Sequence, residues 1–337
     1  MIWKSLWAVM LASAELTTAG FAGAGLAGSD SQAAVQEAPA STQSSAIDST
    51  DDTLPDPAEI ERIRLQRDRY ERITVPVTIA GEGPYRFLID TGSQATAVTR
   101  RVVTDLELEP TGQATLIAMG SREIVETISL NGVEFANRRL NGITAPLLKT
   151  QNIGADGILG LDSLQDLRVQ IDFRENRMAV ADAEALGDVG FEIVVRARRK
   201  LGQMIITNAR VNGVRTAVVI DTGAQNSIGN HVLRRKLRAR DENEQQTSTD
   251  VNGTELHSDL AFARKLTIGG LELSRVPIGF AESPVFAALG LDKRPALVLG
   301  MNNLRLLNRV AIDFSSREIL FDLPTGSRQR TKSRLSL

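Results

Sequence analysis

Short apolar runs separated by turn signals dominate the chain from about residue 70 onward, and they predict β-strands. Two strand pairs stand out, each joined by a turn rich in Gly or Asn: 73–79 with 85–89 around 81–84, and 204–211 with 216–220 around 212–213. A short helical pattern follows each pair, at 99–106 and at 230–237. Because Val, Ile, Thr and Gly are frequent in these runs, the pattern predicts a mainly β protein with few helices.

The same order of segments occurs twice. Each copy continues with two apolar residues before a glycine, in Ile158-Leu159-Gly160-Leu161 and Val298-Leu299-Gly300-Met301. Each then closes with a similar strand, at 169–173 and 310–314, and both of these strands end in Ile-Asp-Phe. A repeat of this length predicts two lobes of one fold, because solenoid repeats are shorter. We place the lobes at residues 70–182 and 189–324, joined by a link at 183–190.

The two ends of the chain have a different composition. Lys4, the apolar run from Leu6 to Ala12 and the small residues that follow resemble an export signal, so residues 1–28 are predicted to be a signal peptide and tail. Residues 29–69 are predicted to be a disordered and charged linker, in which 59–72 could form a short helix. Residues 325–337 form a basic tail. This organisation predicts a periplasmic or secreted protein, with no membrane span after signal removal.

Composition narrows the chemistry. The 337-residue chain has a net charge of −2, contains no cysteine and has only two histidines. Disulfides, thiol catalysis and cysteine-bound metals are therefore excluded, and we expect neither a metal nor a cofactor. The near-zero net charge gives no indication of nucleic-acid binding.

The triplet Asp-Thr-Gly ends an apolar run twice, at Asp90-Thr91-Gly92 and at Asp221-Thr222-Gly223. An Asp at a buried strand end is costly to ionise, and two such carboxyls within a few ångströms share one proton. The ionised member can then take a proton from water while the protonated member donates to a carbonyl oxygen. The two glycines allow close approach of the loops, and the two threonine hydroxyls can hold them together. One triplet alone would indicate only a turn.

These paired motifs resemble the retropepsin-like and pepsin-like aspartic peptidase superfamily over about residues 70–324. The resemblance implies an all-β fold of two pseudo-symmetric barrel-like lobes with a substrate cleft between them. It implies Asp90 and Asp221 as the catalytic pair, with Thr91, Gly92, Thr222 and Gly223 supporting them in the loops. It also implies Leu159-Gly160 and Leu299-Gly300 as the segments that support these loops. The lobes are similar in size to those of bacterial retropepsin-like proteins.

In this superfamily, hairpins called flaps close over the substrate. Here Met119-Gly120 could form the tip of the first flap and Asn252-Gly253 that of the second, although either could be a plain surface hairpin. The expected function is hydrolysis of polypeptide substrates by a monomer whose two lobes pair within one chain. The alternative is an inactive periplasmic module that binds an extended polypeptide by strand addition.

Overall fold

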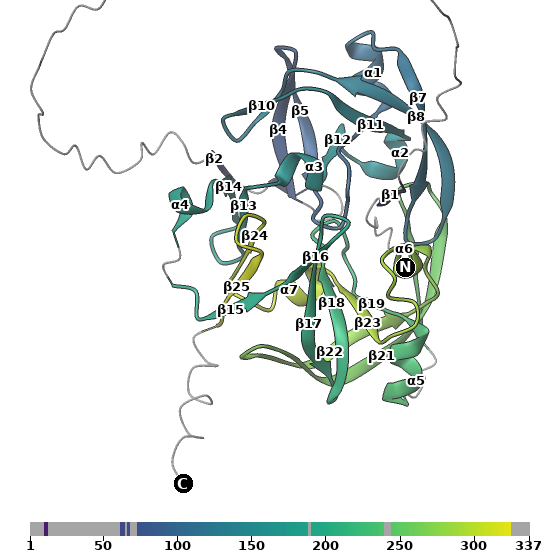
Figure 1. Cartoon of the computed structure of the whole chain (residues 1–337), viewed down its shortest axis with the longest axis vertical. Helices are drawn as coiled ribbons and strands as arrows, with labels where there is room; N and C mark the ends of the chain where they lie inside the picture. Colours follow the sequence, from purple (N-terminus) through teal and green to yellow (C-terminus); the bar gives the residue numbers. More distant parts are fainter. Residues whose placement is uncertain are drawn as a thin grey trace, which may run out of the picture. The chain divides into compact units, whose positions relative to one another are not determined.

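The computed structural model describes residues 10–12, 61–64, 66–67, 73–187, 190–238 and 244–324 (Figure 1). The predicted signal peptide lies outside these residues except for 10–12, and so do most of the predicted linker and the basic tail. Export therefore stays a prediction, as do the lobe boundaries. Within the described part of the chain, no helix is long and apolar enough to cross a membrane.

The described chain is built mainly from β-strands arranged in three sheets, which confirms the predicted fold class. The largest sheet holds most of the first repeat. We refer to β4 to α3 as the first lobe. Its strands, in order across the sheet, are β1 (Met10–Ala12), β7 (Pro110–Ile117), β8 (Arg122–Leu130), β11 (Ile143–Leu148), β6 (Ala97–Thr99), β12 (Gly157–Leu159), β5 (Glu82–Ile89), β4 (Ile73–Ile79), β9 (Val133–Phe135) and β10 (Arg138–Leu140), with β3 (Gln66–Arg67) paired to β4.

The eight-stranded sheet holds the second repeat, and we refer to β16 to α7 as the second lobe. Its strands, in order across the sheet, are β16 (Arg198–Lys200), β17 (Gln203–Val211), β18 (Val214–Ile220), β23 (Ala296–Leu299), β19 (Ile228–Gly229), β22 (Leu271–Phe280), β21 (Glu255–Ile268) and β20 (Gln245–Thr249). The order β17-β18-β23-β19-β22-β21-β20 matches β4-β5-β12-β6-β11-β8-β7 of the first lobe. The repeat read from the sequence is therefore also a repeat of topology.

Short helices connect the strands. They are α1 (Arg100–Asp105), α2 (Thr150–Ile153), α3 (Leu161–Leu164), α4 (Ala183–Leu186), α5 (His231–Leu237), α6 (Pro284–Ala288) and α7 (Met301–Leu304). The helices predicted after the two triplets correspond to α1 and α5, and the side chain of Asn230 caps α5 by accepting from the Leu233 amide at 2.9 Å. The link between the repeats contains α4, which the sequence pattern did not indicate.

Two local predictions were wrong. Residues 81–84 were predicted to be a turn, but β5 already begins at Glu82 and the turn is confined to Ala80 and Gly81. The charged stretch 59–72 was expected to be able to form a short helix, but its described residues form β2 (Glu61–Arg64) and β3. β2 pairs antiparallel with β14 (Arg177–Ala181) and β3 with β4, because backbone groups at a sheet edge are satisfied by a further strand.

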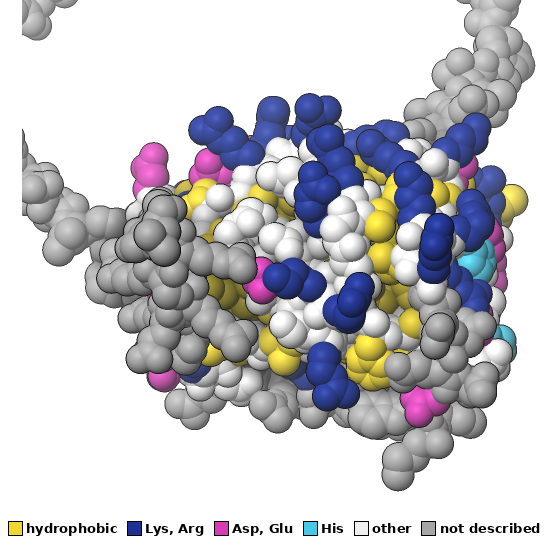
Figure 2. All heavy atoms as spheres, turned by 90° about the horizontal axis from the view of Figure 1, so that it is seen from below, with side chains coloured by type: hydrophobic (Ala, Val, Ile, Leu, Met, Phe, Trp, Pro, Cys, Tyr) yellow, Lys and Arg dark blue, Asp and Glu magenta, His cyan; other side chains and the backbone are white. Residues whose placement is uncertain are grey.

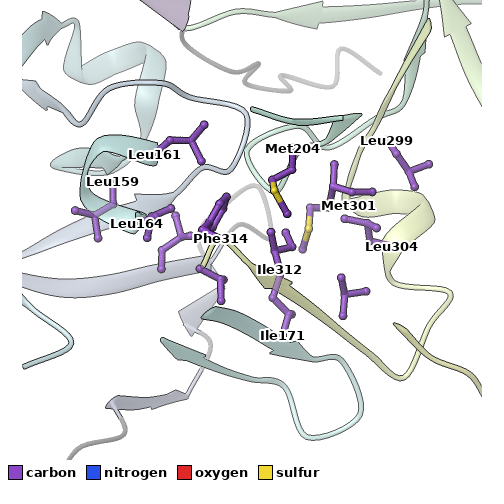
Figure 3. Packing of buried hydrophobic residues seen from close by; sticks show 14 of the residues in the cluster. Leu159, Leu161, Leu164, Ile171, Met204, Leu299, Met301, Leu304, Ile312 and Phe314 are labelled. Atoms are coloured by element: carbon purple, nitrogen blue, oxygen red, sulfur yellow. The ribbon is translucent and has the colours of Figure 1, made fainter. Parts of the chain in front are cut away.

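A six-stranded sheet joins the two repeats. Its strands, in order, are β15 (Ile193–Arg196), β25 (Glu318–Asp322), β24 (Arg309–Asp313), β13 (Arg168–Asp172), β14 (Arg177–Ala181) and β2. The two Ile-Asp-Phe segments meet here, because β13 and β24 pair antiparallel with Arg168 opposite Asp313. Figure 3 shows the core beside them, where Ile171 and Ile312 lie between Leu159 on one side and Leu299 on the other, the leucines of the two apolar-apolar-Gly segments. The core therefore connects the joining sheet to both supporting segments.

The joining sheet contains a buried ion pair. The Arg168 guanidinium donates to Asp313 Oδ2 at 2.7 Å from Nη2, and both side chains are almost inaccessible. Burial raises the pKa of Asp313, but hydrogen bonds from Ser316 and Ser315 and the Arg168 guanidinium together hold that pKa below its ordinary value. The pair therefore stabilises the fold above the pKa of an unfolded Asp, and its contribution is lost as the pH falls through the lowered pKa.

Removing one partner of this pair is expected to be costly. Arg168→Met leaves the Asp313 carboxylate buried without its cation, so the free energy of unfolding should fall by about 3–5 kcal/mol. The exposed pair of Arg196 and Glu318 in the same sheet is the matched control, and Arg196→Met should cost less than about 1 kcal/mol. Urea unfolding measures both variants. Equal losses would contradict a special role for the buried pair.

Lys and Arg side chains gather on the face at the lower end of Figure 1, where strands of the second lobe lie, and Asp and Glu are sparse there (Figure 2). In β16, Arg198, Arg199 and Lys200 are all exposed to solvent. These three side chains therefore belong to the solvated surface, as is usual for a run of charged residues.

Candidate active site

Each Asp-Thr-Gly triplet follows directly from a buried central strand. Asp90 comes after β5 and Asp221 after β18, and each of these strands pairs parallel with the strand of its apolar-apolar-Gly segment. The Asp90 amide donates to the Leu159 carbonyl at 3.1 Å, and the Asp221 amide donates to the Leu299 carbonyl at 3.1 Å. The two segments that the resemblance implied as supports therefore hold both aspartates at the ends of their strands.

Within each loop the aspartate carboxylate accepts two backbone amides. Asp90 Oδ1 accepts from Gly92 at 2.8 Å and Ser93 at 3.0 Å. Asp221 Oδ1 accepts from Gly223 and Ala224, both at 2.9 Å. These bonds fix Oδ1 of each carboxyl, and Oδ2 of Asp90 lies beside Gly223 of the other triplet.

The threonines of the triplets lock the two loops together. Thr91 Oγ1 donates to the Ile220 carbonyl at 3.0 Å, and Thr222 Oγ1 donates to the Ile89 carbonyl at 2.8 Å. Each hydroxyl also accepts the amide of the other threonine, at 3.1 and 3.2 Å. Thr91 and Thr222 thus make four hydrogen bonds that cross from one lobe to the other. Both halves of the site come from a single chain.

The two carboxyls are buried and in contact. Asp90 is 3% and Asp221 is 1% exposed. Burial is the largest cause that raises the pKa of Asp221 well above its ordinary value, the charge of Asp90 is the second, and a hydrogen bond between the two side chains adds to both. Hydrogen bonds from Ala224 and Gly223 oppose the shift without cancelling it. The arrangement therefore favours a single proton shared by the pair.

Glycines make this closeness possible. A Cβ at position 223 would lie 2.3–2.7 Å from the carboxyl atoms of Asp90, well inside contact distance. A Cβ at Gly160 would meet the backbone of Ala95 at 2.3 Å, and one at Gly300 would meet the carbonyl oxygen of Asn226 at 2.5 Å. At these three positions a neighbouring group comes so close to the glycine backbone that a Cβ would not fit. This close approach, rather than a special dihedral angle, requires glycine there.

The predicted flap residues lie at the tips of two hairpins. Met119 and Gly120 are at the tip between β7 and β8, which we call the first flap. Asn252 and Gly253 are at the tip between β20 and β21, which we call the second flap. The two tips contact each other, because Asn252 Nδ2 donates to Ser121 Oγ at 2.8 Å.

Sequence reasoning missed Gln203, the first residue of β17. Its side chain is 1% exposed and donates from Nε2 to the Gly92 carbonyl, while its Oε1 has no hydrogen-bond partner. Gln94, beside the first triplet, donates across the lobes to the Leu201 carbonyl at 2.6 Å. A polar residue at the start of an apolar strand is only a weak indication of a role at the site. The hydrogen bond from Gln203 of the second lobe to Gly92 of the first reveals that Gln203 supports the Asp90 loop.

Within the described residues, no group of three or more His, Asp or Glu side chains is arranged to hold a metal ion. The chemistry that the site offers from its own side chains is that of two carboxyls, one able to keep a proton and one able to accept it.

A two-lobed β fold whose paired Asp-Thr-Gly loops bring two carboxyls into contact defines an aspartic-peptidase type of site. A family model described as aspartyl protease matches residues 75–163 and 207–303, together more than half of the chain, and the chain belongs to this family. Among solved structures, a retropepsin-like aspartic protease from Rickettsia conorii is similar, with 22% identity and a TM-score of 0.29. That match covers 39% of this chain and 89% of the other. A search of curated proteins finds no match.

Proposed function

We propose that this protein is an aspartic endopeptidase that hydrolyses polypeptides with Asp90 and Asp221. The observation that carries the proposal is the contact between two buried carboxyls, because it favours one shared proton. Membership of the aspartyl protease family supports the same conclusion.

In the proposed mechanism the two carboxyls have complementary roles. The ionised carboxylate accepts a proton from a water molecule, and the oxygen of that water attacks the peptide carbonyl carbon. The protonated carboxyl donates to the carbonyl oxygen and stabilises the tetrahedral intermediate. The C–N bond then breaks as the carboxyl that took the proton from water gives it to the leaving amine, while the carbonyl re-forms and returns its proton to the other carboxyl. The pair as a whole keeps one proton, so one carboxyl acts as the base while the other acts as the proton donor. Thr91, Thr222, Gly223 and Gln203 act indirectly, by fixing the geometry of the loops.

The proposal is tested by incubating the protein with a mixture of peptides between acid and neutral pH. The double variant Asp90→Asn/Asp221→Asn serves as the blank, because Asn preserves the size of both side chains and removes both titrating groups. Cleavage by the wild type alone is the expected result. If wild type and double variant cut equally, or neither cuts, the peptidase proposal is wrong.

A further inference from the structure

Four exposed arginines lie on neighbouring strands of the second lobe. In its sheet, β17 pairs with β18 on one side and with β21 on the other, and β21 pairs with β22. Arg210 and Arg215 are direct partners across β17 and β18. Both arginines are exposed, whereas Val211 and Leu266, which face each other across β17 and β21, are buried in the core. The arginines therefore stand on the outer face of the sheet.

A second pair of arginines lies across β21 and β22. The register of these two strands places Arg264 opposite Arg275, and both side chains are exposed. Arg275 also has a φ of 53°, in the left-handed region that suits Gly or Asn better than Arg. Because like charges directly opposite each other destabilise a sheet, folding alone gives no reason for two such pairs.

The positive charge of this face is not neutralised within the described part of the chain. The guanidinium groups of Arg210 and Arg215 donate to neutral backbone carbonyls of their own hairpin, at 3.0 and 2.9 Å. None of the four arginines forms an ion pair with another described residue, and the nearby Glu272 of β22 pairs with Lys265 at 2.7 Å. Figure 2 shows the end of the molecule where strands of this lobe lie, with many Lys and Arg side chains and few Asp or Glu.

An exposed aromatic ring lies beside these charges. Phe262 is 42% exposed, faces Pro277 of β22, and comes two positions before Arg264 in β21. Side chains two positions apart in a strand share a face. Arginine binds phosphate groups with two parallel hydrogen bonds, and aromatic rings are favoured at the headgroup level of a bilayer. The combination therefore fits the surface of a bilayer that contains anionic lipids.

The spread of the arginines also favours an extended partner. They come from four adjacent strands, which span about 14 Å at about 4.8 Å between strands, so one phosphate group cannot contact them all. A bilayer surface offers many phosphates in one plane. Arg215 is the second residue of β18, whereas Asp221 follows its last residue, about 20 Å further along at about 3.3 Å per residue. A membrane bound at the arginines therefore leaves the aspartate pair at a distance.

We propose that Arg210, Arg215, Arg264, Arg275 and Phe262 form a surface, which we call the basic face, that binds membranes containing anionic phospholipids. The arginines bind lipid phosphates, and the Phe262 ring enters the headgroup layer. This binding does not depend on whether the protein is a peptidase. Because arginine stays protonated, the affinity should respond to salt concentration rather than to pH.

The test is cosedimentation of the full chain with vesicles of phosphatidylcholine alone, or of phosphatidylcholine and phosphatidylglycerol in equal parts. We expect binding to the mixed vesicles, weakened by salt, and at least about 10-fold weaker in the double variant Arg264→Ser/Arg275→Asn. Asn at position 275 accepts the left-handed backbone. Urea unfolding should show no loss of stability in this variant, because it removes an opposed pair of like charges.

The matched control is Arg100→Ser/Arg139→Ser. Both side chains are exposed in the first lobe, at 69% and 66%, and their removal changes the net charge by the same amount. This variant should bind the mixed vesicles as the wild type does. All variants share the same N-terminal segment, so any contribution of that segment to binding cancels in the comparison.

The part played by Phe262 is tested separately. Phe262→Ser should weaken binding about 5-fold and leave the salt dependence unchanged, whereas loss of the two arginines should reduce the salt dependence. Equal binding of the wild type to both kinds of vesicle, or an equal loss in the first-lobe control, would overturn the proposal. Binding to soluble polyphosphate without binding to vesicles would also overturn it, and would assign the basic face to a soluble polyanion.

Discussion

Either single variant, Asp90→Asn or Asp221→Asn, is expected to cleave peptides about 1,000-fold more slowly than the wild type, and as slowly as the double variant. The reason is that the base and the proton donor act as one unit, so removing either member removes the whole effect. The measurement is kcat/KM for one cleaved peptide. A single variant that retains a tenth of the wild-type rate would contradict the shared-proton mechanism.

The pH dependence of the wild-type rate has a definite sign. Cleavage requires one proton on the pair, so the rate should fall as the pH rises through the raised pKa of Asp221, where both carboxyls become ionised. It should also fall in strong acid, where both become protonated. A profile that instead keeps rising toward alkaline pH would exclude the pair as the active groups.

Asp221→Asn, which should slow cleavage, is expected to make the folded protein more stable. Because burial and Asp90 raise the pKa of Asp221, the folded protein loses stability as the pH rises from the unfolded pKa through the folded one. Asn does not ionise and can still accept from Gly223 and Ala224. At neutral pH the variant should therefore be more stable than the wild type.

Urea unfolding at neutral pH and near pH 3 checks this difference. The gain should disappear at the lower pH, because Asp221 is then protonated in both the folded and the unfolded wild type. A variant less stable than the wild type at both values would contradict the expected relief of buried charge.

Gly223→Ala is expected to lower both the stability of the protein and its rate of peptide cleavage. Its Cβ would lie as close as 2.3 Å to the carboxyl of Asp90, so the loop must move although four hydrogen bonds hold it in place. Overpacking of this kind costs about 1–3 kcal/mol, and a displacement of about 1 Å at reacting groups can cost about 100-fold in rate. We expect both effects, measured by urea unfolding and by kcat/KM.

The matched control is Gly270→Ala in the turn between β21 and β22. A Cβ there would meet its nearest neighbour, in Ile193, at an ordinary 3.6 Å. This variant should keep the wild-type rate and nearly all of the wild-type stability. If Gly223→Ala behaved like Gly270→Ala, the close approach at the aspartate pair would be of no importance for function.

Much of the fold followed from local pattern. The strand pairs before the triplets, the helices α1 and α5 and the two Ile-Asp-Phe strands depend on apolar periodicity and turn residues that lie close together in the chain. The repeat of segment order was visible for the same reason. The errors arose where distant partners decide, as at residues 61–67, whose strands exist because β14 and β4 offer free edges.

The sequence by itself determined that two Asp-Thr-Gly triplets end equivalent buried strands, that each has a supporting glycine segment, and that no thiol can take part. These features are local, so a linear pattern can carry them. Only the tertiary structure decided that the threonine hydroxyls cross between the lobes, that Gln203 supports the Asp90 loop, and that Asn252 joins the flap tips. Each of these contacts links residues more than 100 positions apart, and their geometry depends on how the two lobes pack.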